Sequence, residues 1–235
     1  MEINRKIHPK NRAGRRVKIE ILNTSVVITA EHHNPTILHP SFLASEKVVP
    51  PDWETVETVC TPVFAIVRYK NGIVFNVEEN KFQVTDNKIK DDFKKSQVSD
   101  LACKYAEKLP HVHYSAVGVN FNGFIECAEA ESTVIRQFLR RNSANFNGCS
   151  PQALGLRLVY NLPDARLRVS LDGGKVNGGT EKERSGVLVN ANYHMDLPDK
   201  SRENRIKGLQ KATSLFTQHC DNFINVIGTI FPLED

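Results

Sequence analysis

The sequence of 235 residues lacks long apolar runs, paired cysteine motifs and any nucleotide-binding or hydrolase signature. No stretch approaches the roughly 20 consecutive apolar residues of a membrane-spanning helix, which excludes a membrane-embedded protein. The five cysteines are scattered and never form CxxC, a pattern that predicts reduced thiols in a cytoplasmic protein instead of disulfides or a thiolate zinc site. Because GxSxG, HExxH and the dinucleotide-binding glycine fingerprint are also absent, no motif identifies a reaction.

Aromatic residues are missing from the one strongly basic stretch, residues 1–18. Seven Lys or Arg stand there against one Glu, a net charge of +6, so the rest of the chain carries −2 of the total of +4. The stretch has no apolar core of a secretory signal, which again indicates a cytoplasmic protein. We interpret it as a flexible solubilising arm. The alternative is an arm that binds nucleic acid or another anion through Arg5, Lys6, Lys10, Arg12, Arg15, Arg16 and Lys18.

Alternation of apolar and polar residues after the arm predicts antiparallel strands. The first is VKIEILNTSVVITAEH, and a meander follows over residues 61–87, with a type I′ turn expected at Asn71-Gly72 and a second turn at Glu79-Asn80. Further strands are expected in HVHYSAVGVNFNGFIE, with a turn or bulge at Asn122-Gly123, in a hairpin around Pro163-Asp164, and in GVLVNANYHMDLP.

Apolar residues at helical spacing predict three amphipathic helices, in SQVSDLACKYAEKLP, in ESTVIRQFLRRN, and from about residue 204 to 230. The last helix has an apolar stripe that would pack on the sheet: Leu209, Ala212, Phe216, Cys220, Phe223 and Ile227.

We therefore predict an α+β fold of antiparallel β-meanders, each followed by a helix, with a loosely duplicated βββα plan as a hypothesis. The arm, residues 1–18, precedes one domain, residues 19–235, whose halves would be residues 19–145 and 150–235.

The segment TAEHHNPTILHP, residues 29–40, concentrates three histidines and a glutamate. On a continuing strand Glu31 and His33 share a face while His32 points to the other, and a reversal at Asn34-Pro35 would return His39 toward them. Two imidazoles and a carboxylate are enough ligands for a catalytic zinc or a similar divalent metal. We favour the simpler interpretation, in which these are structural or solvent-facing histidines beside a turn.

A second histidine pair, His111 and His113, has the i, i+2 spacing that places both rings on one side of a strand. The pair has no third ligand nearby in the sequence, so a metal site would need both clusters to converge. Histidines that face solvent at the entrance of a strand are the interpretation that we favour. No cofactor is therefore predicted, and a divalent metal such as zinc remains the alternative.

Arginines recur on the polar faces of the predicted hairpin at Arg157, Arg166 and Arg168. One interpretation is that they form a basic patch with Arg140 and Arg141. Tyr160 points to the face opposite Arg157, so the sheet lacks the aromatic platform of single-stranded RNA readers. A solvated face is the interpretation that we favour.

Three stretches resemble a family of conserved cyanobacterial proteins that has no established activity: ITAEHHNPTILHPSFL, LPHVHYSAVGVNFNGF and LRLVYNLPDARLRV. The resemblance covers most of the chain after the arm. It implies a bacterial intracellular protein and a single compact unit, and it assigns no site residues.

The leading functional interpretation is a non-enzymatic cytoplasmic binding or interaction module. Its partner would be another protein or a second copy, bound through an exposed sheet edge or helix face, with no membrane partner. One alternative is a metal-dependent hydrolase that uses the two histidine clusters, in which a bound ion lowers the pKa of water. The other is a nucleic-acid-associated factor that acts through the basic arm.

Overall fold

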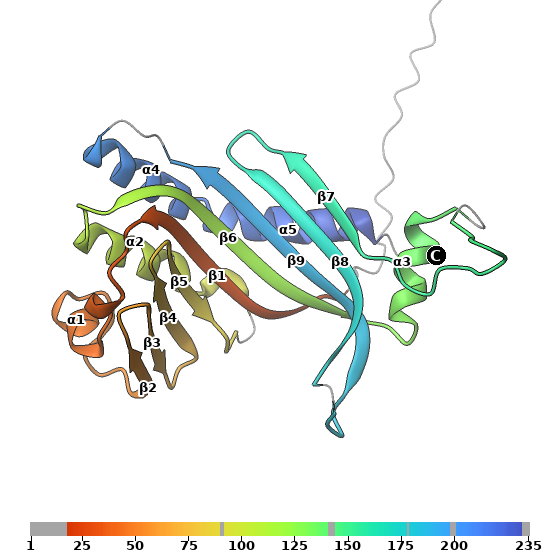
Figure 1. Cartoon of the computed structure of the whole chain (residues 1–235), viewed down its shortest axis with the longest axis horizontal. Helices are drawn as coiled ribbons and strands as arrows, with labels where there is room; N and C mark the ends of the chain where they lie inside the picture. The colour runs from red at the N-terminus through yellow and green to blue at the C-terminus, as the bar shows by residue number, and fades with distance from the viewer. Residues whose placement is uncertain (1–17, 90–91, 141–143, 178, 198–200, 232–235) are drawn as a thin grey trace, which may run out of the picture.

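A computed structural model describes residues 18–89, 92–140, 144–177, 179–197 and 201–231 of the chain. Its centre is one antiparallel sheet in the order β2-β3-β4-β5-β1-β6-β9-β8-β7. The strands are β1 (Glu20–Glu31), β2 (Thr55–Cys60), β3 (Phe64–Tyr69), β4 (Ile73–Glu78), β5 (Lys81–Asp86), β6 (His113–Glu126), β7 (Leu156–Asn161), β8 (Arg166–Val176) and β9 (Arg184–Asp196). The predicted α+β fold is confirmed (Figure 1).

The two longest early strands, β1 and β6, lie side by side in the middle of the sheet. Each also pairs with the last strand of a meander, β1 with β5 and β6 with β9, and a helix follows each meander. The strand order therefore repeats a plan of long strand, meander and helix, with four meander strands the first time and three the second. In this order β6 begins the second unit, whereas the predicted halves divide after residue 145.

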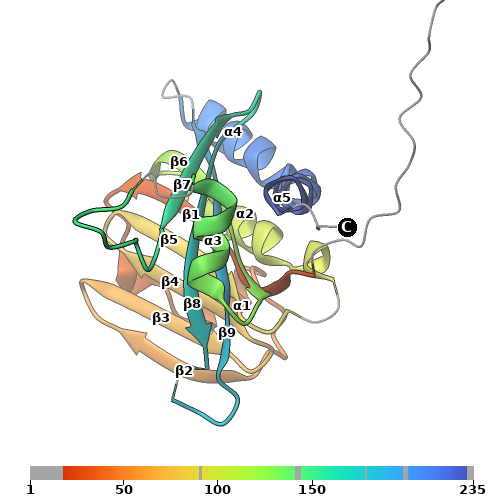
Figure 2. The ribbon, with the colours of Figure 1, turned by 90° about the vertical axis from the view of Figure 1, so that its right-hand side faces the viewer.

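The helices lie on one side of the sheet: α1 (Pro40–Ser45), α2 (Val98–Lys108), α3 (Ala130–Phe138), α4 (Arg202–Ser214) and α5 (Phe216–Ile230). Figure 2 shows α2, α4 and α5 together beside the twisted sheet, and none of the described helices lies on the opposite face of the sheet. Two short 3-10 helices, Pro35–Ile37 and Phe93–Lys95, lie in the connections. No helix in the described ranges is long and apolar enough to cross a membrane.

The core lies between the sheet and these helices and is rich in stacked rings. Phe82 of β5 stacks on Tyr105 of α2, with ring centroids 4.0 Å apart. Phe121 of β6 stacks on Phe223 of α5 at 5.2 Å and meets Tyr193 of β9 edge-on at 5.8 Å. Such pairs add to the burial of the apolar area of the rings, so they fix how α2 and α5 sit on the sheet.

The predicted C-terminal helix is divided into α4 and α5 at Leu215, while its apolar stripe is buried as expected. Side chains before the break bond back to the helix, because the Thr213 hydroxyl donates to the Leu209 carbonyl and the Ser214 hydroxyl to the Lys211 carbonyl, at 3.0 and 2.8 Å. The Ser99 hydroxyl of α2 donates a hydrogen bond to the Thr213 carbonyl. Such bonds compete with the helical ladder and bend helices, a cause that apolar periodicity does not report.

The expected turns at Asn71-Gly72 and Glu79-Asn80 both join strands of the meander. The first is not type I′, because only Gly72 has a left-handed φ, +97°, and its N–H donates to the Tyr69 carbonyl at 3.0 Å in a three-residue loop. Asn122-Gly123 is not a turn either. β6 continues through it, opposite a bulge in β1 between Ile21 and Asn23.

Candidate binding surface

The histidine segment is divided between the two sides of the sheet. His32 has a left-handed φ of +58°, which ends the alternation of β1, so Glu31 is exposed and His33 is buried. The expectation that Glu31 and His33 share a face is therefore wrong. The His33 ring lies 6.5 Å from that of Phe82 and 6.0 Å from that of Tyr114.

Burial lowers the pKa of His33, which favours a neutral ring, and its Nε2 atom has no hydrogen-bond partner among the described residues. The backbone N–H of His33 donates to the Glu79 carbonyl at 2.7 Å. This main-chain bond ties the segment after β1 to the β4–β5 turn. The environment of the His33 ring is that of a core side chain.

His39 has a local structural role at the start of α1. Its Nδ1 atom accepts a hydrogen bond from the backbone N–H of Ser41 at 3.2 Å, which caps the helix. His32 is exposed and lies 3.7 Å from Glu79. The contacts of these two rings in the described structure are with Ser41 and Glu79, and not with His33.

The second histidine cluster lies in solvent at the start of β6. His113 is the cross-strand partner of Glu31, and both side chains are exposed, as is His111 in the connection before β6. Across the described ranges, no group of three or more His, Cys, Asp and Glu side chains has an arrangement that would hold a metal ion. The structure thus brings Glu31 and His113 together and leaves the other predicted ligands apart.

Most of the basic arm lies outside the described residues. Only Lys18 of the seven predicted anion-binding residues is described, and it is exposed. The other six are Arg5, Lys6, Lys10, Arg12, Arg15 and Arg16. The arm joins the sheet where β1 begins, at Glu20.

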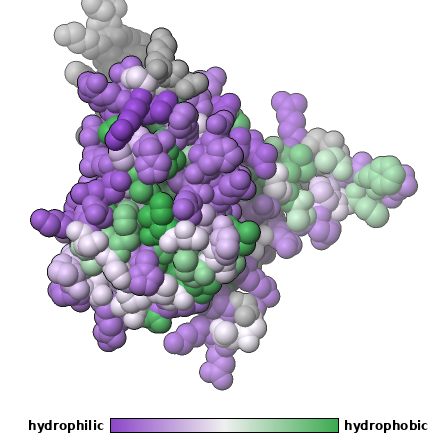
Figure 3. Space-filling model, turned by 60° about the vertical axis from the view of Figure 1, so that its left-hand side comes forward, coloured by the Kyte–Doolittle hydropathy of each residue, from purple (hydrophilic) through white to green (hydrophobic). Residues whose placement is uncertain are grey.

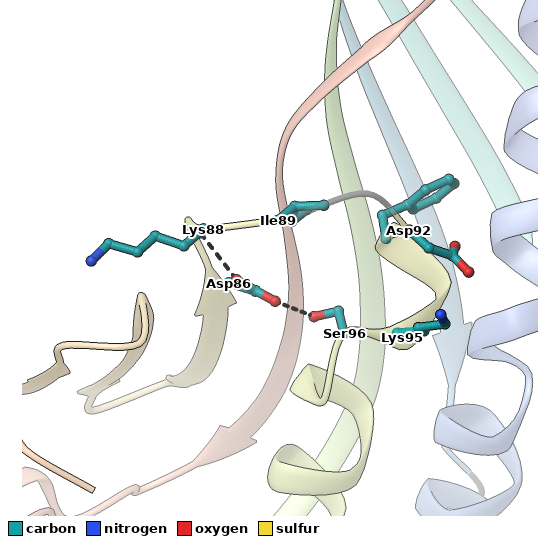
Figure 4. A pocket seen from close by; sticks show the side chains of 7 residues that line it. Asp86, Lys88, Ile89, Asp92, Lys95 and Ser96 are labelled. Carbon is teal, nitrogen blue, oxygen red and sulfur yellow. Dashed lines mark hydrogen bonds between the residues drawn. The ribbon is translucent and has the colours of Figure 1, made fainter.

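A cavity of about 290 Å³ opens between the end of β5 and the Phe93–Lys95 helix (Figure 4). Its central carboxylate, Asp86, accepts hydrogen bonds from the Ser96 hydroxyl at 2.8 Å and from the Lys88 backbone N–H at 3.1 Å. Both bonds hold the connection after β5 in place. Asp86 therefore has a structural role in this cavity.

The larger polar feature is the sheet face opposite the helices, which we call the open face. Side chains of one row cross five neighbouring strands on it, as the strand register shows. We call this row the asparagine row, and from β8 to β5 it consists of Arg168, Asn192, Asn120, Ser25 and Thr85. A parallel row two residues along holds Ser170, Asn190, Asn122 and Asn23.

Hydrogen bonds join the amides of these rows. Asn192 donates to the Asn120 side-chain oxygen at 2.7 Å, and Asn120 donates to the Ser25 hydroxyl at 3.3 Å. In the parallel row Asn122 donates to the Asn23 side-chain oxygen at 2.6 Å. The bonds hold the side chains in fixed positions, because an amide in a chain of such bonds has few alternative orientations.

Three arginines lie at the β7–β8 end of the asparagine row: Arg168 belongs to the row, and Arg157 and Arg166 lie beside it. All three side chains are exposed, and within the described part of the chain none has an ion pair or hydrogen bond to a carboxylate. Elsewhere, arginines such as Arg68 and Arg184 pair with glutamates at 2.6 and 2.7 Å. The predicted shared face of the three arginines is thus observed, while Arg141 lies outside the described residues.

A second, apolar feature lies at the other end of the sheet. Figure 3 brings forward the side of the molecule that carries α1 and β2, and apolar residues gather in the middle of it among polar ones. The exposed apolar side chains of β2 and its turn into β3 are Val56, Val63 and Phe64. Since β2 is an edge strand, this end is where a further strand would have room to pair.

No family model, no curated protein and no solved structure matches this chain. The resemblance to the cyanobacterial family therefore stays a prediction. Sequence analysis located the arginines and missed the asparagine row. The signal was present, since Asn120 and Asn122, like Asn190 and Asn192, recur at the strand period of two, but only the register shows that they align across strands.

Proposed function

We propose that the protein is a non-enzymatic cytoplasmic binding module whose binding surface is the open face of the sheet. The observation that carries the proposal is the asparagine row together with its unpaired arginines. The bonds from Asn192 to Asn120 and from Asn120 to Ser25 stabilise the sheet, and they also hold polar side chains in place on its surface. Less conformational entropy is therefore lost when a partner binds there.

The composition of the open face supports a binding function over catalysis. Its rows hold amides, hydroxyls and guanidinium groups, which donate and accept hydrogen bonds but are weak nucleophiles and bases at neutral pH. The five cysteines are free, and Cys60 and Cys149 are exposed, which agrees with a reducing compartment. A protein partner or a second copy at the β2 edge would be compatible with the same function.

Site-specific photocrosslinking tests the proposal. A photoreactive amino acid is placed at Asn190, which is exposed on the open face, and in a matched variant at Glu203, which is exposed on α4. Each purified variant is irradiated in extract of the organism that encodes the protein. We expect adducts, of whatever chemical class, from position 190 and none from position 203. Equal yields from both positions, or none from position 190, would contradict a binding role for the open face.

A further inference from the structure

The three unpaired arginines form a compact cationic group. Arg166 and Arg168 point to the same side of β8 two residues apart, a separation of about 7 Å along the strand. Arg157 lies on the neighbouring strand, opposite Ser170. Guanidinium groups bind phosphate in a two-pronged geometry, and the backbone of a nucleic acid duplex carries closely spaced phosphates.

Two carboxylates of the open face, Asp172 and Asp196, lie beside the arginine group and outside the asparagine row. Asp172 is two residues along β8 from Ser170, the cross-strand partner of Arg157. Asp196 accepts a hydrogen bond from His194, the cross-strand partner of Arg166, at 3.0 Å. The asparagine row itself contains no acidic residue. A polyanion that enters along the row from Arg168 therefore meets the half-buried amides of Asn192 and Asn120 and no acidic member of the row.

The face has no aromatic platform beside the arginines. Tyr160 pairs with Leu167 and so points to the covered side, and Phe124 is buried under the Arg184 guanidinium, 5.2 Å from the ring centroid. Binding of single strands depends on the stacking of bases on exposed aromatic rings. The missing rings therefore favour a nucleic acid whose bases stay paired.

The width of the open face favours an A-form RNA duplex over a B-form DNA duplex. The asparagine row crosses five strands, which at about 4.8 Å per strand is about 19 Å. This exceeds the roughly 12 Å major groove and 6 Å minor groove of B-form DNA. The minor groove of A-form RNA is wide and shallow and displays 2′-hydroxyls, which donate and accept hydrogen bonds as the amides and hydroxyls of the row do.

We infer that the open face binds double-stranded RNA, with Arg157, Arg166 and Arg168 on the phosphates and the asparagine row along the minor groove. The inference rests on the proposed function, because it names the class of partner for the same surface. Contacts of this kind recognise the shape and backbone of the duplex, so binding is independent of RNA sequence.

Fluorescence anisotropy of the full-length chain with a labelled 20-base-pair RNA of mixed sequence tests the inference over a range of salt concentrations. The test variant carries Arg157→Gln, Arg166→Gln and Arg168→Gln. The control variant removes the same charge from exposed positions of α4, with Arg202→Gln, Lys207→Gln and Lys211→Gln. Both variants keep the basic arm, so its contribution cancels. Their urea unfolding midpoints are compared with that of the wild type to establish that they fold.

We expect the test variant to lose at least tenfold in affinity and to reduce the slope of log K against log salt by about 2 to 3, since about three phosphate contacts are removed. The control should stay within about threefold of the wild type. Three results would overturn the inference: no RNA binding by the wild type, equal losses in both variants, or equal or tighter binding of a DNA duplex or single-stranded RNA of the same sequence. Binding of poly(glutamate) in place of RNA would instead identify an acidic protein as the partner.

The two proposals fail separately. If RNA does not bind while position 190 still crosslinks to another partner, the open face remains the binding surface and only the partner class is wrong. If position 190 yields no adduct and RNA does not bind, both proposals are wrong.

Discussion

The ring of His219 in α5 stacks on the ring of Tyr193 in β9, with centroids 4.3 Å apart and an angle of 21° between the planes. The contact places an ionisable side chain inside the core, where His219 is 3% exposed and its Nε2 atom has no hydrogen-bond partner among the described residues. Tyr193 is held in turn, because its hydroxyl donates to the Asn222 side-chain oxygen at 2.8 Å. The stack joins the last helix to the middle of the sheet.

This stack predicts a loss of stability in mild acid. Burial lowers the pKa of His219 to about 4, below its ordinary value of 6.5, so between these values the unfolded chain binds a proton that the folded chain does not. The stabilising contribution is complete above pH 6.5 and is lost as the pH falls toward 4. We expect the free energy of unfolding to fall by about 2 kcal/mol between pH 7 and pH 5 from this group.

Urea denaturation at both pH values measures the effect, with His219→Phe as the control because phenylalanine keeps the ring and removes the titration. The pKa of His33 is lowered in the same direction by burial, so part of the pH dependence should persist in the variant. An unchanged pH dependence in His219→Phe would contradict the assignment.

Two buried tyrosines predict opposite responses to loss of the hydroxyl group. The Tyr105 hydroxyl is buried without a hydrogen-bond partner in the described structure, whereas the Tyr114 hydroxyl lies 3.0 Å from the Leu109 carbonyl and 3.1 Å from that of Ala106. An unsatisfied buried hydroxyl costs about 1 to 3 kcal/mol, and a satisfied one contributes about 1 kcal/mol. We therefore expect Tyr105→Phe to be neutral or stabilising.

Tyr114→Phe, by contrast, should lower the free energy of unfolding by about 1 kcal/mol. Thermal and urea unfolding of both variants at pH 7.5 provide the comparison, because each removes a single oxygen from a ring in the same core. Similar destabilisation by the two substitutions would show that the Tyr105 hydroxyl has a partner after all.

Local patterns predicted the elements of this fold well. The apolar stripe of the last helix, from Leu209 to Ile227, is buried as its spacing indicates, and the turn at Glu79-Asn80 joins β4 to β5. These features depend on neighbours along the chain, which a sequence displays directly. At the break before Leu215 the Thr213 and Ser214 hydroxyls bond back to the helix, and apolar periodicity does not report such bonds. The Thr213 carbonyl also accepts a hydrogen bond from Ser99 of α2, 114 residues away, and no local pattern contains that contact.

Only part of the candidate surface could be predicted from the sequence, for the same reason. Period-two alternation placed Arg157, Arg166 and Arg168 on polar faces, and the register then placed them on one face. The prediction that Glu31 and His33 share a face was wrong because it extended strand alternation through His32. The left-handed φ of His32 reverses the direction of the following side chain. A non-glycine residue in that conformation is uncommon, so the alternating pattern was the reasonable expectation.

Cysteine labelling is predicted to separate the exposed thiols from the buried ones. Cys60 and Cys149 are exposed, while burial raises the pKa of Cys103 to about 11 and that of Cys220 to about 12. Because the thiolate is the reactive form, maleimide at pH 7.5 should modify Cys60 and Cys149 first, and Cys220 only on unfolding. Peptide mass spectrometry against time gives the order. Early modification of Cys220 in the folded protein would mean that α5 opens locally.

The asparagine row predicts that one amide of the open face is structural as well as exposed to a ligand. Asn120→Ala removes the acceptor of Asn192 and leaves the Ser25 hydroxyl, 3% exposed, without its donor. We expect the free energy of unfolding to fall by about 1 to 2 kcal/mol. Asn190→Ala, on the same strand as Asn192 but exposed, should change it by less than about 0.5 kcal/mol.

Urea unfolding of these two variants, with RNA affinity measured on the same samples, separates a structural role of the two rows from a binding role. If the rows only stabilise the sheet, Asn120→Ala lowers stability and both variants bind as the wild type does. If the rows also line the groove of a duplex, Asn190→Ala in the parallel row weakens RNA binding without loss of stability, since it removes an exposed amide and no internal bond seen in the described structure. Equal stability of Asn120→Ala and the wild type would contradict the hydrogen bonds from which the row is defined.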